Sequence, residues 1–192
     1  MNLVSLSENK EIEKRLAITP EISKKYIDLG LNIFLPNNYG SHLGFDDNQY
    51  KSHGVKFLKD EKEIISNADI IVQLGLLDDL KLSFLKENQT LIGTLNTYNN
   101  KDKLQNLKSK NINCFSLELL PRITRAQSMD ILSSQANLAG YKAVIEAFQI
   151  YERAIPMMMT AAGTIPAAKV LVVGAGVAGL QAIATAKRMG AI

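Results

Sequence analysis

The sequence predicts an α/β protein with two domains that contain parallel sheets and are joined by a long helix. Three observations lead to this prediction. Short apolar runs alternate with helical stretches through residues 1–127, which is typical of parallel strands connected by helices. Residues 128–155 contain no proline and carry apolar side chains at helical spacing. A further apolar run, residues 170–173, leads directly into a glycine-rich turn and another helical stretch.

The first domain, residues 1–127, is expected to begin with a strand, a charged loop and a helix. Thr19 can cap this helix, Pro20 suits its first turn and Gly30 suits its end. Its apolar face is expected to carry Ile22, Tyr26, Ile27 and Leu29. The other strands are expected at residues 32–35, 55–58, 69–74, 90–95 and 112–117, and the other helices just before Gly54 and at residues 61–67 and 101–110.

The long helix expected at residues 128–155 would extend roughly 40 Å, at 1.5 Å per residue. One of its faces carries only small side chains, so a second element could pack closely against it. These residues are Ala136, Ala139, Gly140 and Ala143. We expect the helix to join the first domain to the second, and ligand sites favour the clefts between domains.

The second domain is expected to be represented by its first strand and helix, within residues 156–192. Its glycines form a Gly-x-Gly-x-x-Gly pattern, in which the first glycine makes a tight turn, the second lets a pyrophosphate approach the backbone, and the third lets helix and strand pack closely. The pattern predicts that a dinucleotide lies over Gly174, Ala175, Gly176, Val177, Ala178 and Gly179. The alternative is a tight strand-to-helix turn that binds no ligand.

An acidic residue that holds the adenosine ribose is expected about 20 residues after these glycines. The sequence ends at Ile192, before that position. We therefore expect the chain to be the front part of a longer protein and its second domain to be incomplete. On its own the chain is expected to be inactive and marginally stable, because apolar faces of the second sheet would stay uncovered.

Composition argues against several classes of protein. The net charge is only +3, and Lys and Arg are interspersed with Asp and Glu, so no nucleic-acid partner is expected. Cys114 is the single cysteine, which leaves no disulfide framework and no cysteine-rich metal site. His42 and His53 lack the partners that a metal or catalytic site needs, so no metal is expected.

The amino terminus carries no export signal, which predicts a cytoplasmic location. Residues 154–192 contain few charges, and this leaves open the alternative that they form a membrane hairpin. Pro156, Pro166 and the glycines interrupt the stretch, and Lys169 lies in its middle, which is costly for a helix that faces lipid.

The most distinctive run is residues 118–139, where the long helix begins. Its polar side chains are Arg122, Arg125, Gln127, Asp130, Ser133, Ser134, Gln135 and Asn137. In a purely structural interpretation, Ser128 caps the helix, Asp130 is an acid in its first turn and the arginines are solvated. In a functional interpretation, the run supplies the amide, hydroxyl and carboxylate partners of a nicotinamide and its ribose. Such a site needs no further nucleophile or metal, because the cofactor itself carries the hydride.

Two runs of the sequence resemble the NAD(H)-binding domain of proton-translocating NAD(P) transhydrogenase, at the start of its alpha subunit. They are LLPRITRAQSMDILSSQANLAGYKAVIEA and PMMMTAAGTIPAAKVLVVGAGVAGLQAIATAKRMGA, and the similarity extends more loosely to KRLAITPE near the amino terminus. The resemblance implies two Rossmann-like domains, of which the first, residues 1–127, is flavodoxin-like or Rossmann-like. It also implies direct hydride transfer from NADH to NADP+ held by another domain, driven by proton movement through a membrane part.

The same resemblance implies roles for individual residues. Arg122, Gln127, Asp130 and Ser133 would surround the nicotinamide and its ribose, with Gln127 and Asp130 at the reacting centre and Gln127 reaching towards the partner cofactor. The implied partners are an NADP(H)-binding domain, a membrane domain and a second copy of the chain. The implied location is the cytoplasmic side of the inner membrane, with the chain peripheral to it.

Two alternatives remain. An alanine dehydrogenase would share the fold and the pattern from Arg15 to Pro20, but that family implies a lysine where Gly75 stands and a histidine where Asn96 stands. Neither residue can replace the proton chemistry of its counterpart. The other alternative is a non-catalytic nucleotide-binding or membrane-associating module.

Overall fold

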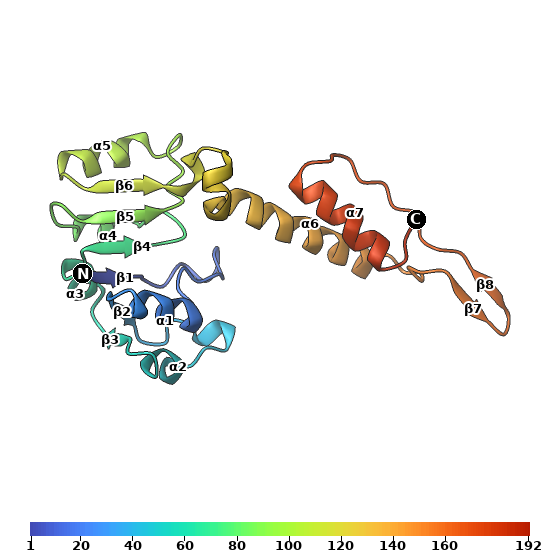
Figure 1. Ribbon diagram of the computed structural model, residues 1–192, viewed down its shortest axis with the longest axis horizontal. Coiled ribbons are helices and arrows are strands. Elements are labelled where there is room, and N and C mark those ends of the chain that lie inside the picture. The colour runs from blue at the N-terminus through green and yellow to red at the C-terminus, as the bar shows by residue number, and fades with distance from the viewer. The chain divides into compact units, whose positions relative to one another are not determined.

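The computed structural model describes all residues from Met1 to Ile192, and these form two compact units. The first unit comprises Met1–Leu120 and the second comprises Pro121–Ile192. Figure 1 labels the helices and strands of both units. Each unit has its own hydrophobic core, so each is described separately.

The first unit is built on a six-stranded sheet in which every neighbouring pair of strands is parallel. The strands are β1 (Asn2–Val4), β2 (Asn32–Pro36), β3 (Lys56–Leu58), β4 (Ile70–Val72), β5 (Thr90–Gly93) and β6 (Asn113–Ser116). The helices are α1 (Pro20–Asp28), α2 (Asp47–Lys51), α3 (Glu61–Ser66), α4 (Asp79–Ser83) and α5 (Lys101–Ser109), with short 3-10 turns η1 (Ser41–Leu43) and η2 (Leu117–Leu119). The predicted α/β class is confirmed.

The strand order is β3-β2-β1-β4-β5-β6. The chain moves outward from β1 to β3 and then returns to place β4 on the other side of β1. This reversal creates a topological switch point at the carboxyl ends of β1 and β4, which is where open α/β sheets commonly bind ligands.

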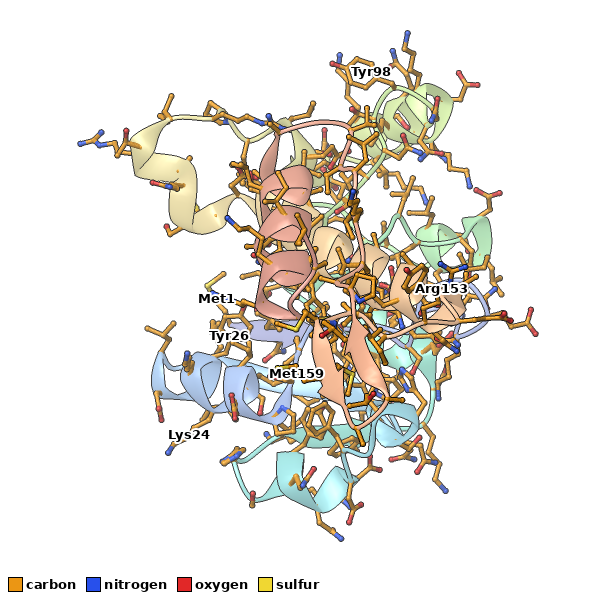
Figure 2. All side chains as sticks on the ribbon, turned by 90° about the vertical axis from the view of Figure 1, so that its right-hand side faces the viewer. Met1, Lys24, Tyr26, Tyr98, Arg153 and Met159 are labelled. Atoms are coloured by element: carbon orange, nitrogen blue, oxygen red, sulfur yellow. The ribbon has the colours of Figure 1, made fainter.

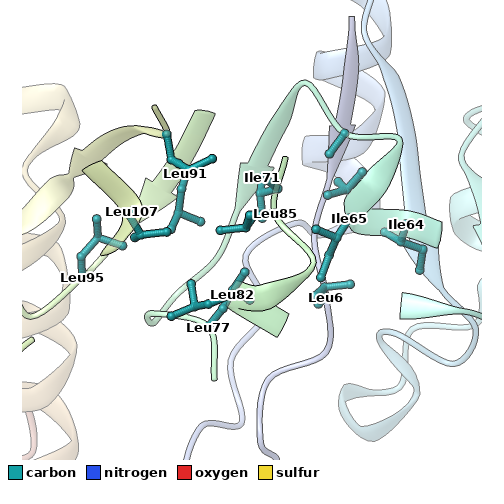
Figure 3. Packing of buried hydrophobic residues seen from close by; sticks show 13 residues of the cluster. Leu6, Ile64, Ile65, Ile71, Leu77, Leu82, Leu85, Leu91, Leu95 and Leu107 are labelled. Atoms are coloured by element: carbon teal, nitrogen blue, oxygen red, sulfur yellow. The ribbon is translucent and has the colours of Figure 1, made fainter. Parts of the chain in front are cut away.

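Two hydrophobic clusters cover opposite faces of this sheet. Leu3 and Val4 belong to different clusters because successive side chains of a strand point to opposite faces. Figure 3 shows the cluster that contains Leu6, Ile71 and Leu91. The burial of both faces explains why the strands are continuous apolar runs rather than alternating ones.

Helix α1 begins and ends where the sequence predicts. The Thr19 hydroxyl accepts a hydrogen bond from the Ile22 N–H at 3.4 Å, and Gly30 has a φ of +85°. The prediction that Leu29 lies on the apolar face was wrong. Leu29 is the C-cap residue and is 75% exposed, because the helix ends at Asp28 and the chain turns away from the core. Helix α4, which Asp78 caps through the Lys81 N–H, was not predicted.

Two buried tyrosines link the loop before α1 to the segments that follow β2. The Tyr39 hydroxyl lies 2.8 Å from the Ser5 hydroxyl, and the Tyr50 hydroxyl donates to the Ile18 carbonyl at 3.0 Å. Burial raises the pKa of Tyr39 and the pKa of Tyr50 above the ordinary phenol value. The folded chain therefore keeps two protons that the unfolded chain releases at alkaline pH.

We expect the free energy of unfolding of the first unit to decrease as the pH rises above about 10, the ordinary phenol pKa. Below that pH the contribution of the tyrosines is fully present, and above it the contribution falls by at most about 1.4 kcal/mol per pH unit for each tyrosine. Urea unfolding between neutral and alkaline pH measures the slope. The variant Tyr39→Phe with Tyr50→Phe should lose part of this slope, whereas Tyr98→Phe, at an exposed position, should keep it.

The second unit consists of a 3-10 turn, two packed helices and a hairpin. Its elements are η3 (Thr124–Met129), α6 (Ile131–Ile150), β7 (Met158–Thr160), β8 (Gly163–Ile165) and α7 (Val177–Arg188). Helices α6 and α7 lie side by side (Figure 1). A Cβ atom on Gly140 would overlap the Ala178 carbonyl oxygen, so the predicted close approach of another element to the small-residue face of α6 is confirmed.

Helix α6 is shorter at both ends than the helix expected at residues 128–155. Residues 124–129 form the 3-10 turn, and the chain leaves the helix at Tyr151, five residues before Pro156. The twenty residues of α6 correspond to about 30 Å at 1.5 Å per residue. The antiparallel hairpin of β7 and β8 was not predicted. Its Met159, labelled in Figure 2, is 83% exposed.

The prediction of a strand at residues 170–173 was wrong for this structure. The segment is extended, but it belongs to no sheet, because the only backbone that pairs with it is the single residue Ile192. A strand needs neighbouring backbone along its length to satisfy its N–H and C=O groups. The sequence pattern describes the strand correctly, whereas the sheet that it requires is not present.

The alternative of a membrane hairpin at residues 154–192 finds no support in the helices. None of the helices is both long enough and apolar enough to cross a bilayer. Helix α7 has only 12 residues, and an extended hairpin and turn occupy much of the remaining stretch.

Candidate dinucleotide site in the second unit

The glycine turn before α7 has the three features that the pattern predicts. Gly174 has a φ of +109°, which L side chains rarely adopt, so it makes the tight turn. A Cβ atom on Gly176 would meet nothing within 4 Å, so the space above this backbone is open. A Cβ atom on Gly179 would overlap the Gly174 carbonyl oxygen, so the helix packs directly against the turn.

The amino terminus of α7 is free to bind an anion. Its N-cap residue, Gly176, has no side chain that could accept a hydrogen bond from the first turn. No acidic residue lies in that turn, and Lys187 and Arg188 lie in the last turn. The positive end of the helix dipole and the first N–H groups therefore face the open space above Gly176.

A hollow of about 390 Å³ joins this turn to the start of α6. It is lined by Arg122, Leu132, Ser133, Ala136, Val173, Gly174, Gly176, Val177, Ala178 and Gly179. Two of the predicted polar residues, Arg122 and Ser133, thus lie in the same hollow as the glycines. A guanidinium and a hydroxyl beside a helix amino terminus form a suitable environment for a phosphate or a ribose.

Gln127 and Asp130 lie in a neighbouring hollow of about 250 Å³. It is lined by Pro121, Arg122, Ile123, Thr124, Ala126, Gln127 and Asp130. Arg122 belongs to both hollows and is the one predicted site residue that connects them. The predicted residues therefore form two adjacent groups instead of one ring around a single point.

Asp130 and Ser133 are bound to each other. The Asp130 carboxylate accepts hydrogen bonds from the Ser133 N–H at 2.9 Å and from the Ser133 hydroxyl at 2.6 Å. These bonds, helped by the positive charge of Arg122, hold the pKa of Asp130 below its ordinary value. Asp130 therefore stays ionised at neutral pH.

The helix cap expected at Ser128 lies at Asp130 instead. Ser128 is part of the 3-10 turn, and Asp130 is the first residue whose side chain can reach the N–H groups of α6. Asp130 thus has a structural role as the N-cap, and the structural and functional interpretations of this residue are compatible.

The other polar residues of the run contribute less to the two hollows. Arg125 and Asn137 are exposed and line neither of them. The Ser134 hydroxyl donates to the Ile131 carbonyl at 3.0 Å, within its own helix. The apolar lining residues Leu132 and Ala136 were missed, although their spacing of four residues, continued by Gly140, places them on one helix face.

The positions that would carry amino-acid dehydrogenase chemistry are occupied differently in the first unit. The Arg15 guanidinium donates to the Glu13 carboxylate at 2.8 and 2.6 Å. The Gly75 N–H donates to the Glu8 carboxylate at 3.4 Å, and Asn96, with a φ of +48°, accepts from Asn99 within a local turn. No group of three or more His, Cys, Asp or Glu side chains lies close enough together to hold a metal ion.

Comparison with known proteins identifies the family. Residues 5–139 match the family described as alanine dehydrogenase/PNT, N-terminal domain, and residues 143–192 match alanine dehydrogenase/PNT, C-terminal domain. The chain is 48% identical to the first part of NAD(P) transhydrogenase subunit alpha of Rickettsia prowazekii, over the whole chain and 51% of that protein. It therefore spans about half the length of the curated relative that it matches.

Solved structures agree with this result. A transhydrogenase from Sinorhizobium meliloti matches 98% of this chain and 57% of its own, with a TM-score of 0.91 and 42% identity. An L-alanine dehydrogenase matches the whole chain and 53% of its own, with a TM-score of 0.82 but only 21% identity, and this likeness concerns the fold alone. The chain thus belongs to the alanine dehydrogenase/PNT family and resembles, over its whole length, the NAD(P) transhydrogenase alpha subunits of that family.

Proposed function

We propose that the chain is the NAD(H)-binding part of a proton-translocating NAD(P) transhydrogenase. In this enzyme, hydride would pass directly from NADH on this chain to NADP+ on another domain, coupled to proton movement through a membrane part. The observation that carries the proposal is the hollow in which the glycine turn faces Arg122 and Ser133. The similarity to transhydrogenase alpha subunits supports it.

The glycine turn would bind the pyrophosphate of the dinucleotide. Gly176 leaves room for a phosphate to approach the backbone, and the N–H groups at the start of α7 would donate to its oxygens. Ala175, Val177 and Ala178 would contribute backbone within the same turn. Arg122 would place a positive charge beside the phosphates or the nicotinamide ribose.

Asp130, Ser133 and Gln127 would orient the nicotinamide and its ribose. Asp130 is ionised and already accepts two hydrogen bonds from Ser133, so it would be held in place to accept from a ribose hydroxyl or a carboxamide. Gln127 is exposed in the neighbouring hollow, where its amide could reach a second cofactor. The bound nicotinamide supplies the hydride, so the side chains need only bind and orient.

The proposal includes the partners and the location that such an enzyme needs. The chain would bind NAD(H), while an NADP(H)-binding domain and a membrane domain would belong to its partners, and a second copy of the chain would form a homodimer with it. It would lie in the cytoplasm, peripheral to the inner membrane. These statements rest on the family resemblance rather than on the geometry of the hollow.

We expect Gln127→Asn to slow hydride transfer while leaving the binding of NADH nearly unchanged. The shortened amide would no longer reach the partner cofactor, and a misplacement of about 1 Å can cost roughly a hundredfold in rate. Stopped-flow measurement of hydride transfer in the assembled enzyme gives the rate, and NADH fluorescence titration gives the dissociation constant. NADH is expected to bind more tightly than NADPH.

Ser134→Ala is a matched control for this experiment, because Ser134 lies on the adjoining helix but lines neither hollow. It should change neither the rate nor the affinity. If Gln127→Asn removed NADH binding outright, Gln127 would be a binding group and its proposed role would be lost. Alanine-dependent reduction of NAD+ by the assembled enzyme would favour the dehydrogenase alternative.

A further inference from the structure

Residues 168–173 have the hydrogen bonding of a strand that has only begun to pair. The Val170 N–H donates to the Ile192 carbonyl at 2.8 Å, and the Ile192 N–H donates to the Ala168 carbonyl at 2.8 Å. This pattern places Ile192 opposite Lys169 in a parallel ladder. Beyond this pair, the backbone N–H groups of Leu171 and Val173 have no hydrogen-bond partner in the chain.

The two faces of this segment are in different environments. Ala168, Val170 and Val172 pack on the core formed by α6 and α7. Leu171 and Val173 point away from that core and are 88% and 92% exposed. A hollow of about 450 Å³, lined largely by apolar side chains of α6 and of this segment, runs beside it.

This combination is typical of a strand from the middle of a parallel sheet. Such strands are apolar on both faces because helices cover both faces, and their edges are paired with further strands. An added peptide in extended conformation would pair with an edge but would leave Leu171 and Val173 uncovered. The surface therefore fits a partner that supplies both a strand and a covering helix.

We propose that residues 169–173 are the docking surface for a separate polypeptide that carries the second half of the nucleotide domain. The length of the relatives argues for this occupant, because the chain corresponds to only 51% of the Rickettsia prowazekii protein. The parallel pair at Ile192 shows the direction in which a neighbouring strand would run. The inference rests on the proposed function, since the completed domain is the one that would bind NADH.

The experiment is co-expression of the 192-residue chain with the segment of the Rickettsia prowazekii protein that follows its alignment with this chain. We expect a complex with one copy of each chain, detected by size-exclusion chromatography with light scattering. Hydrogen exchange of the Leu171 and Val173 amides should slow by at least about tenfold in the complex. NADH fluorescence is measured on the same sample as a separate readout.

Substitution of the exposed face tests the location of the surface. Leu171→Asp with Val173→Asp is expected to weaken the complex by at least about tenfold, because two carboxylates would have to enter an apolar contact. Leu80→Asp is the matched control, since Leu80 is 67% exposed in the first unit, and it should leave the complex unchanged. Circular dichroism of each free variant checks that its helices are intact.

Three results would overturn the docking proposal. They are the absence of a complex on co-expression, a complex that survives the double substitution, and self-association of the chain that the double substitution abolishes. The last result would identify a second copy as the occupant. A complex that forms as expected but does not bind NADH would support the docking surface and sink the proposed function, so the two failures are distinguishable.

Discussion

Gly179→Ala is expected to lower the free energy of unfolding of the second unit by about 2–3 kcal/mol and to abolish NADH binding. The new Cβ would overlap the Gly174 carbonyl oxygen, which is a backbone atom in a constrained turn. Either the turn must open or α7 must move away from it. Both changes remove the surface on which a pyrophosphate would lie. Hydrogen exchange of the α7 amides measures the loss of stability, and fluorescence titration measures NADH binding.

Gly176→Ala is the matched control for this prediction. Gly176 has an ordinary φ of −77°, and its Cβ would meet no protein atom within 4 Å. Stability should therefore stay the same or rise slightly, as for other Gly→Ala changes at compatible positions. The methyl group would occupy the space that a phosphate needs, so NADH affinity should fall by at least about tenfold, or 1.4 kcal/mol.

This pair of variants separates folding from ligand binding. Gly179→Ala is expected to affect both, whereas Gly176→Ala is expected to affect binding alone. Unchanged NADH affinity in Gly176→Ala would place the pyrophosphate elsewhere, and the glycine turn would then be only a close contact between a turn and a helix. Unchanged exchange of the α7 amides in Gly179→Ala would contradict the steric argument itself.

Gln73→Leu is expected to destabilise the first unit by about 2–4 kcal/mol, as the sum of lost hydrogen bonds and an unpaired buried donor. Gln73 is 4% exposed at the carboxyl end of β4. Its side-chain oxygen accepts from the Leu6 N–H at 2.6 Å and from the Ser5 hydroxyl at 3.0 Å. Its amide group donates to the Glu8 carboxylate at 3.1 Å.

Leucine has a similar volume but offers neither an acceptor nor a donor. The Leu6 N–H would remain buried with no partner, and Ser5 would keep only its bond to Tyr39. Because this network lies at the topological switch point, it also fills the place where open α/β sheets commonly bind ligands. The change should therefore reduce stability without removing a site in the first unit.

Gln105→Leu is the control for this experiment. Gln105 is an exposed residue of α5, so the same chemical change there should alter stability by no more than about 0.5 kcal/mol. Urea unfolding followed by hydrogen exchange of β1 and β4 amides reports on the first unit alone. A Gln73→Leu variant as stable as the native chain would mean that water replaces the lost hydrogen bonds.

The features that the sequence alone determined depend on residues close together in the chain. Thr19, Pro20 and Gly30 start and end α1 through contacts within one or two helical turns, and the structure confirms them. The tight turn at Gly174 and the contact at Gly179 are equally local, and both were predicted. Alternating apolar runs and helices were sufficient for the parallel sheet, because parallel strands require long crossovers.

Only the tertiary structure decided the contacts between distant parts of the chain. It places Arg122 and Ser133 beside glycines that follow some forty to fifty residues later, and it separates them from Gln127. It binds Gln73 to Leu6 across 67 positions of sequence, and no local pattern announces that partner. Residues 170–173 have the composition of a strand, yet pairing needs a neighbouring backbone that composition cannot supply. Local propensity depends on a few adjacent residues, whereas a site or a sheet depends on the path of the whole chain.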